Sequence, residues 1–146
     1  MKIKVTPTIS EPIYLQELSL EIAGIEGGIP QTEQAWVKIR QATEQDHIAR
    51  ADLLAKRVMT YGDQISETVE DNPRERMMYE AYWTLYETGN LTDEDGKPIF
   101  PEMPAKKMTL EKFQEIWGKL DSSITMAIWA AVRKGNPDWD FNRGKA

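Results

Sequence analysis

The sequence predicts an α+β domain in which an N-terminal antiparallel β hairpin or small sheet packs on three to four helices. Two patterns support this class. Apolar and polar residues alternate in parts of residues 1–42, as in half-buried strands, whereas apolar residues recur at helical spacing in residues 43–135. A chain of 146 residues is the size of one domain. We therefore expect a single domain over residues 1–146, mainly β over 1–42 and mainly helical over 43–135, with a C-terminal tail over 136–146.

The first candidate strand contains Ile3 and Val5, which alternate with polar residues as in a half-buried strand. Two prolines follow within the next residues and favour an edge position, because proline has no N–H to donate to a neighbouring strand. Residues 13–22 fit either a strand or one face of a helix. The alternation of apolar residues from Leu18 to Ile22 favours a strand for the second half of this segment.

The clearest strand covers residues 34–41, where Val37 and Ile39 point to one side and polar or aromatic residues to the other. A cluster of glycines between Gly24 and Pro30 precedes it and predicts a turn or loop. The strands before and after this loop would then pair as an antiparallel hairpin.

Two helix start signals follow the β region. Thr43 is a suitable N-cap with acidic residues in the next turn, and Asn72 is an N-cap followed by proline at the first helical position. The second predicted helix runs to residues 89–90 and is apolar over so much of its circumference that we expect it to be the central helix. The first ends near residues 61–62, and its apolar stripe consists of Ile48, Ala51, Leu54, Ala55, Val58 and Met59.

The C-terminal part of the chain predicts a turn and two more helices. Residues 92–98 are rich in turn formers and compatible with a short hairpin. Thr109 caps the first helix, and Asp121 or the following serine caps the second. Gly135 occupies the expected C′ position of the last helix, where Asn-Pro then prevents its continuation.

Composition excludes several chemistries. The chain has no cysteine, which removes disulfides, thiolate catalysis and zinc sites built on sulfur. A single histidine, His47, cannot build a multi-histidine metal site within one chain. The 18 basic and 24 acidic residues give a net charge of −6, which argues against a cationic surface for nucleic acid or for lipid. The chain has no long apolar run and no apolar leader segment, so we expect a soluble, cytoplasmic protein.

Short motifs do not add up to a catalytic, cofactor or metal site, and we expect none. Residues 93–96 lack the spacing of a calcium-binding loop and are better explained as an acidic turn. The glycosylation motif at Asn90 is a chance match in a chain without a signal peptide. His47 is better explained as a solvent-facing residue of a helix than as a general base, and the Glu111/Glu115 pair as a solvent-facing pair.

Methionine and tryptophan are frequent, with seven and five residues, and most occupy helical core positions. Six side chains form the predicted protein-binding surface: Met77, Met78 and Trp83 on the central helix, and Trp129, Trp139 and Phe141 near the C-terminus. Apart from Trp83, these side chains are difficult to bury together. Flexible methionines beside aromatic rings are typical of adaptable protein-binding surfaces.

Three segments carry a family resemblance: residues 36–43 followed by Asp46 and Arg50, residues 89–98, and residues 113–139 with Phe113, Trp117 and Leu120. Together they resemble the tail assembly chaperones of tailed bacteriophages and prophages, which are encoded between the tail-tube and tape-measure proteins. The resemblance covers about residues 34–139. It implies a non-enzymatic protein without cofactor that binds hydrophobic helices of the tape-measure protein during tail morphogenesis.

The resemblance also implies further partners and leaves one alternative. The tail-tube subunit is a second candidate partner, and self-association into a homo-oligomer is compatible with the family. The alternative function is that of a virion structural protein, such as a neck, connector or tail-completion subunit, which assembles through an exposed β edge.

Overall fold

Three antiparallel strands form one sheet in the order β1-β2-β3. The central strand, β2 (Trp36–Ile39), lies between β1 (Ile13–Tyr14) and β3 (Leu85–Gly89). This sheet belongs to a computed structural model that describes residues 1–60 and 72–139 of the chain, without the side chains of residues 56–60. The sheet packs on helices, so the α+β class with an N-terminal β hairpin is confirmed.

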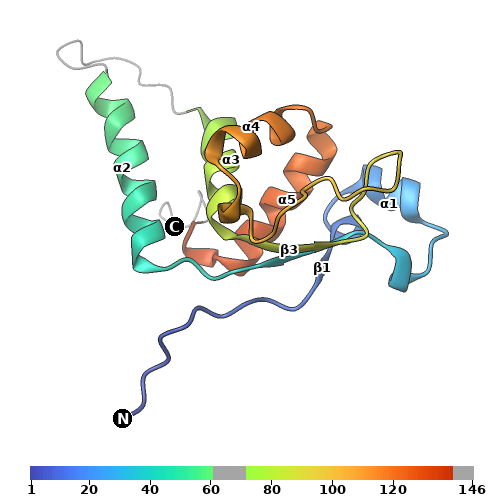
Figure 1. Ribbon diagram of the computed structural model, residues 1–146, viewed down its shortest axis with the longest axis horizontal. Helices are drawn as coiled ribbons and strands as arrows, with labels where there is room; N and C mark the ends of the chain where they lie inside the picture. Colours follow the sequence, from blue (N-terminus) through green and yellow to red (C-terminus); the bar gives the residue numbers. More distant parts are fainter. Residues whose placement is uncertain (61–71, 140–146) are drawn as a thin grey trace.

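Helices cover one face of the sheet and flank its ends. Figure 1 shows α3, α4 and α5 above the sheet, with α1 at one end and α2 at the other. The α-helices of the described residues are α1 (Leu20–Glu26), α2 (Glu44–Thr60), α3 (Pro73–Thr84), α4 (Leu110–Gly118) and α5 (Ser122–Gly135). The short 3-10 helices are η1 (Leu15–Glu17), η2 (Gln31–Glu33), η4 (Ala105–Lys107) and η5 (Pro137–Trp139).

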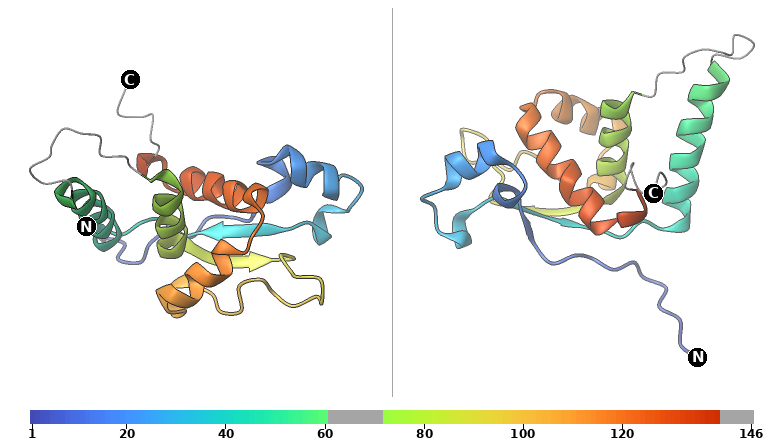
Figure 2. Two further views of the ribbon diagram at one scale, coloured as in Figure 1. Left: turned by 90° about the horizontal axis from the view of Figure 1, so that it is seen from above. Right: turned by 180° about the vertical axis from the view of Figure 1, so that it is seen from behind.

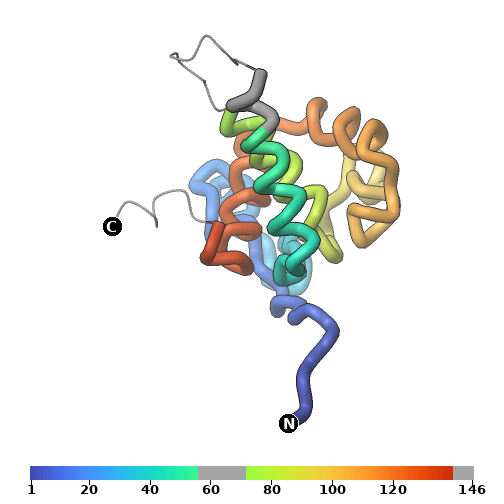
Figure 3. The backbone as a smooth tube through the Cα atoms, turned by 90° about the vertical axis from the view of Figure 1, so that its left-hand side faces the viewer, coloured from blue at the N-terminus to red at the C-terminus, as the bar shows by residue number. Residues whose placement is uncertain are grey.

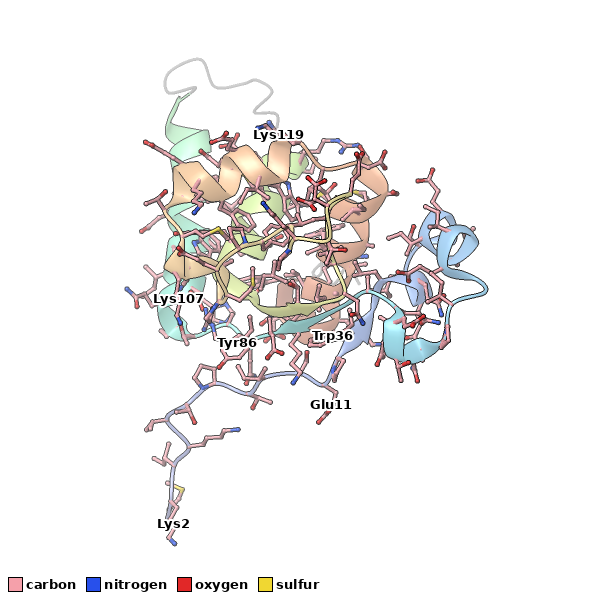
Figure 4. The ribbon with its side chains drawn as sticks, turned by 45° about the vertical axis from the view of Figure 1, so that its right-hand side comes forward. Lys2, Glu11, Trp36, Tyr86, Lys107 and Lys119 are labelled. Atoms are coloured by element: carbon pink, nitrogen blue, oxygen red, sulfur yellow. The ribbon has the colours of Figure 1, made fainter. Side chains whose placement is uncertain are left out.

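Strand β2 follows the predicted alternation. Val37 and Ile39 are buried beneath the helices, whereas Trp36 and Lys38 are half-buried on the opposite face. The Lys38 ammonium lies 5.7 Å from the centre of the Trp36 ring, so the aliphatic stem of the lysine covers part of the outer face. Figure 4 shows Trp36 and Tyr86 on this outer side of the sheet. The prediction of a strand within residues 34–41 is confirmed.

The predicted β character of residues 1–42 is wrong in two places. Ile3 and Val5 are not half-buried but 72% and 89% exposed, in an extended segment that leaves the body of the protein (Figure 2). Residues 20–26 form α1 rather than a strand, and Gly24 lies inside this helix rather than in a loop. The reason is local, because the Ser19 hydroxyl caps the helix by accepting a hydrogen bond from the Ile22 N–H at 3.3 Å.

Helix α2 begins as predicted. Thr43 and Asp46 form a reciprocal capping box, in which the Thr43 hydroxyl accepts from the Asp46 N–H and the Asp46 carboxylate accepts from the Thr43 N–H. The predicted apolar stripe does not pack into the core, since Ile48 is 53% exposed. The side chains of Val58 and Met59 and the predicted helix end at residues 61–62 lie outside the described residues.

The central helix starts at the predicted cap but ends earlier than expected. Asn72 accepts a hydrogen bond from the Glu75 N–H, and buried residues on several faces confirm that α3 is central. The prediction of a helix as far as residues 89–90 is wrong, because the chain turns extended at Leu85 and becomes β3. Pairing with β2 through long-range hydrogen bonds overrides the local helical pattern.

The C-terminal helices complete the core. Thr109 and Asp121 are the N-caps of α4 and α5, as predicted, and the Thr92–Pro98 bridge closes the predicted short hairpin. The prediction of Gly135 as a C′ residue is wrong, because it is the last helical residue and Asn136 is the cap. The predicted tail is described only to Trp139, which lies in η5 and is buried.

Candidate interaction surface

Three of the six predicted binding residues are part of the protein's interior. Met77 and Met78 are 5% and 8% exposed, and Trp139 is also buried. The expectation that these side chains are difficult to bury together is therefore wrong for these three residues, because α3 is surrounded by other elements. Phe141 lies outside the described residues. In the folded chain, the three buried side chains are not accessible to a partner.

The tryptophans are held by a buried polar network between α2, α3 and α5. Glu80 is fully buried and accepts hydrogen bonds from the Arg50 Nε at 2.6 Å and from the Trp129 Nε1 at 3.0 Å. The Arg50 guanidinium also lies 5.5 Å from the centre of the Trp139 ring, and Trp83 packs edge-on against Trp139. This network therefore brings Trp83, Trp129 and Trp139 into one structural cluster, in which the burial of a carboxylate is offset by its hydrogen bonds.

His47 belongs to the same side of the molecule. Its Nδ1 accepts a hydrogen bond from the Trp139 Nε1 at 3.0 Å, and the two rings pack edge to face. The side chain is partly buried rather than solvent-facing, so that detail of the prediction is wrong. The contact joins the start of α2 to the end of the chain's described part.

Asp46 forms a second buried ionic group, at the base of α2. Its carboxylate accepts from the Lys106 Nζ at 2.6 Å, from the Arg40 guanidinium at 2.7 Å and from the Thr43 N–H. Burial by itself would raise the pKa of Asp46, but these hydrogen bonds and the Arg40 charge together lower it below the ordinary value of 3.8. Asp46 therefore stays ionised and ties α2 to the sheet and to η4.

A hollow on the described surface lies between α1 and the start of α5. It has a volume of about 430 Å³ and continues into a second, shallower hollow that shares Glu21, Asp121 and Ser123. We call the two hollows together the α1–α5 groove. Its apolar lining consists of Leu15, Leu18, Leu20, Ile22, Ile25, Ala35, Leu91, Ile99, Ile124, Met126 and Ala127.

Carboxylates line the rim of this groove. Glu21 and Asp121 are exposed, and Glu26 is half-buried. The Ser123 N–H and hydroxyl donate to Asp121 and lower its pKa, so this carboxylate is charged over the whole neutral range. One oxygen of Glu26 accepts from the Ala35 N–H at 3.0 Å, whereas the other is buried and accepts no hydrogen bond from any described residue. The groove is therefore both apolar and negatively charged.

Exposed hydrophobic side chains gather at the same place. Leu20 and Ile25 on α1 are 93% and 78% exposed, and Met126 on α5 is also exposed. Sequence reasoning missed this surface, although one signal was present. Helix α1 has only seven residues, yet it carries three large apolar residues and a glycine, which is more than one buried face can hold.

Comparison of the chain with known protein families, with characterised proteins and with solved structures finds no match. Among residues 1–60 and 72–139, no three histidine or acidic side chains are arranged to hold a metal ion. No helix within the described part of the chain has the length and apolar character needed to cross a membrane.

Proposed function

We propose that this protein is a non-enzymatic tail assembly chaperone of a tailed bacteriophage, which binds hydrophobic helices of the tape-measure protein in the host cytoplasm. The tail-tube subunit is the second proposed partner. The observation that carries the proposal is the α1–α5 groove, where exposed Leu20, Ile25 and Met126 surround an apolar hollow. An amphipathic helix would place its apolar side chains in such a groove.

The character of the groove suits temporary binding. Exposed apolar side chains cost solubility, and the charges of Glu21 and Asp121 keep such a surface hydrated. The net charge of −6 acts in the same direction over the whole chain. An acidic protein that shields a partner's hydrophobic helices and then releases them needs both properties.

The surface predicted from methionine and tryptophan is replaced in this proposal. Met77, Met78 and Trp139 contribute to the fold instead, since they are buried. In this proposal the partner contacts residues of α1 and α5 instead. The His47–Trp139 hydrogen bond supports a structural role for the single histidine and agrees with a non-enzymatic function.

The proposal is tested by co-expression with the tape-measure protein encoded beside it. We expect the native chain to keep the tape-measure protein soluble and to co-purify with it. Ile25→Asp should abolish the complex without unfolding the chaperone, because this side chain is 78% exposed. Ile48→Asp is the matched control, since it places the same charge on an exposed residue of α2 and should leave the complex intact. Equal complex formation by both variants would reject the groove as the contact surface.

The alternative is a virion structural protein that assembles through its β edge. It is favoured by the short edge strand β1 and by the exposed, extended residues before it. Mass spectrometry of purified virions separates the two functions. A chaperone should be absent from mature particles, whereas a structural subunit should be present in a fixed ratio to the tail proteins.

A further inference from the structure

Apart from Ile48 on α2, the exposed large hydrophobic side chains of the described residues lie in two places. One is the α1–α5 groove, with Leu20, Ile25 and Met126, and the other is residues 1–8, which we call the N-terminal arm. Ile3 and Val5 of the arm are as exposed as the groove residues. Each of these two apolar surfaces is exposed to water, which is unfavourable in free energy. Contact between the two surfaces would bury both and remove this cost.

The two surfaces also carry opposite charges. The arm contains Lys2 and Lys4, and the first acidic residue of the chain is Glu11, beyond the arm. The groove carries the carboxylates of Glu21, Glu26 and Asp121. Glu21 and Asp121 are exposed at the rim, where their carboxylates can pair with lysine ammonium groups.

The arm is directed away from the groove of its own chain. Its end is held beside β2, because Ser10 donates to the Ile39 carbonyl and the Gln41 N–H donates to the Thr8 carbonyl, both at 2.8 Å. Beyond this anchor, the arm projects from the body (Figure 3), and its first residues and α1 lie at opposite ends of the molecule in both views of Figure 2. Figure 4 shows Lys2 at the far tip. In this conformation the arm of another copy, and not the chain's own arm, can reach the groove.

We propose that the N-terminal arm of one copy binds in the α1–α5 groove of a second copy. Ile3 and Val5 enter the apolar hollow, and Lys2 and Lys4 meet the carboxylates of its rim. The extended arm is about 26 Å long, which suffices to run along a groove between two helices. The contact joins two different surfaces, so it is head-to-tail, and an assembly that does not close into a ring has a free arm at one end and a free groove at the other. It does not depend on the role in tail assembly.

The interface is small. An arm of eight residues buries well under the roughly 1,200 Å² of a stable standard interface, so self-association should be weak and should depend on concentration. Sedimentation velocity between about 5 and 500 μM is the direct measurement, because weak interfaces of this size dissociate in the micromolar range. We expect the average mass of the native protein to rise with concentration and the rise to shrink at high salt.

Variants on either side of the contact should abolish this rise. The double variant Ile3→Asp/Val5→Asp and the single variant Ile25→Asp should each weaken self-association at least about tenfold in dissociation constant. All three side chains are exposed, so the fold should stay intact. Ile48→Asp is the control and should associate like the native protein. A native protein that stays monomeric up to about 500 μM, or an association that none of the arm and groove variants alters, would overturn the proposal.

Mixing the two variants tests the head-to-tail geometry. The arm variant keeps an intact groove, and Ile25→Asp keeps an intact arm, so the mixture should form a one-to-one complex that grows no further. A symmetric contact between identical surfaces would give no such rescue and would overturn the proposed arrangement.

Because the chain has no cysteine, the contact can also be trapped chemically. A Val5→Cys chain should form a disulfide with an Ile25→Cys chain, and markedly less with an Ile48→Cys chain.

Discussion

Gly135 of α5 and Ile39 of β2 are in direct contact, and a Cβ atom added at position 135 would lie 2.7 Å from the Ile39 Cγ2. The contact seats the end of α5 on the central strand. A glycine near a helix end usually indicates a cap residue in the left-handed conformation. Here glycine is needed because the space beside Ile39 is too small for a Cβ atom.

We therefore expect Gly135→Ala to destabilise the protein by about 1–3 kcal/mol through overpacking. Inside a helix, replacing glycine by alanine ordinarily stabilises a protein by up to about 1 kcal/mol. A loss of stability in Gly135→Ala would therefore indicate overpacking against Ile39. Gly118→Ala at the end of α4 is the matched control, because nothing lies within 4 Å of the added methyl group. Urea denaturation of both variants measures the difference. A Gly135→Ala protein as stable as Gly118→Ala would show that Ile39 can move aside.

A second prediction concerns Asp46 and pH. Its pKa is lowered in the folded state, so its contribution to stability is complete above the unfolded value of about 3.8 and is lost as the pH falls through the lower folded value. Asp46→Asn removes the charge that Arg40 and Lys106 share, and we expect it to cost up to about 3 kcal/mol at pH 7. The measurement is urea denaturation of both proteins at several pH values. The gap between them should shrink as the pH falls below 4, and a constant gap would contradict the role of the carboxylate charge.

The sequence predicted the starts of α2, α3, α4 and α5 from local signals, although it missed the equally local Ser19 cap of α1. Thr43, Asn72, Thr109 and Asp121 each accept a hydrogen bond from an N–H two or three residues later, so side chain and helix lie within one turn. The sequence did not predict β3, because its hydrogen bonds are with β2, almost 50 residues earlier in the chain. A helical pattern that continues past Thr84 therefore gave the wrong secondary structure.

The position of the candidate surface was not predicted for a similar reason. Ile25, Leu91 and Ile124 come together in the groove from three distant parts of the chain. Burial of Met77 is likewise a property of the packing around α3. The sequence shows that a short segment has more apolar residues than one helix face can bury. Which of these residues stay exposed depends on how the helices and strands pack against one another in the folded protein.

A third prediction tests Trp129 as a structural rather than a partner-binding residue. Its indole N–H donates to the fully buried Glu80, so Trp129→Phe leaves one carboxylate oxygen without that donor. We expect a loss of about 1–3 kcal/mol in the free energy of unfolding. In a Glu80→Met background the same substitution should cost less, because the hydrogen bond no longer exists, and a double-mutant cycle measures this coupling. Additive effects would contradict the assigned contact.

The fourth prediction separates the folding role of α3 from the proposed binding role of α1. Met77→Asp places a charge at a position that is only 5% exposed and should cost more than about 3 kcal/mol, which unfolds a marginal domain. Ile25→Asp places the same charge on an exposed helix surface and should change stability by less than about 0.5 kcal/mol while removing partner binding. Thermal unfolding and co-purification, measured side by side, check the pair. If the Met77→Asp protein folds but does not bind the partner, the contact surface lies on α3 and not on α1. Such a result would mean that the Met77 side chain is accessible to the partner.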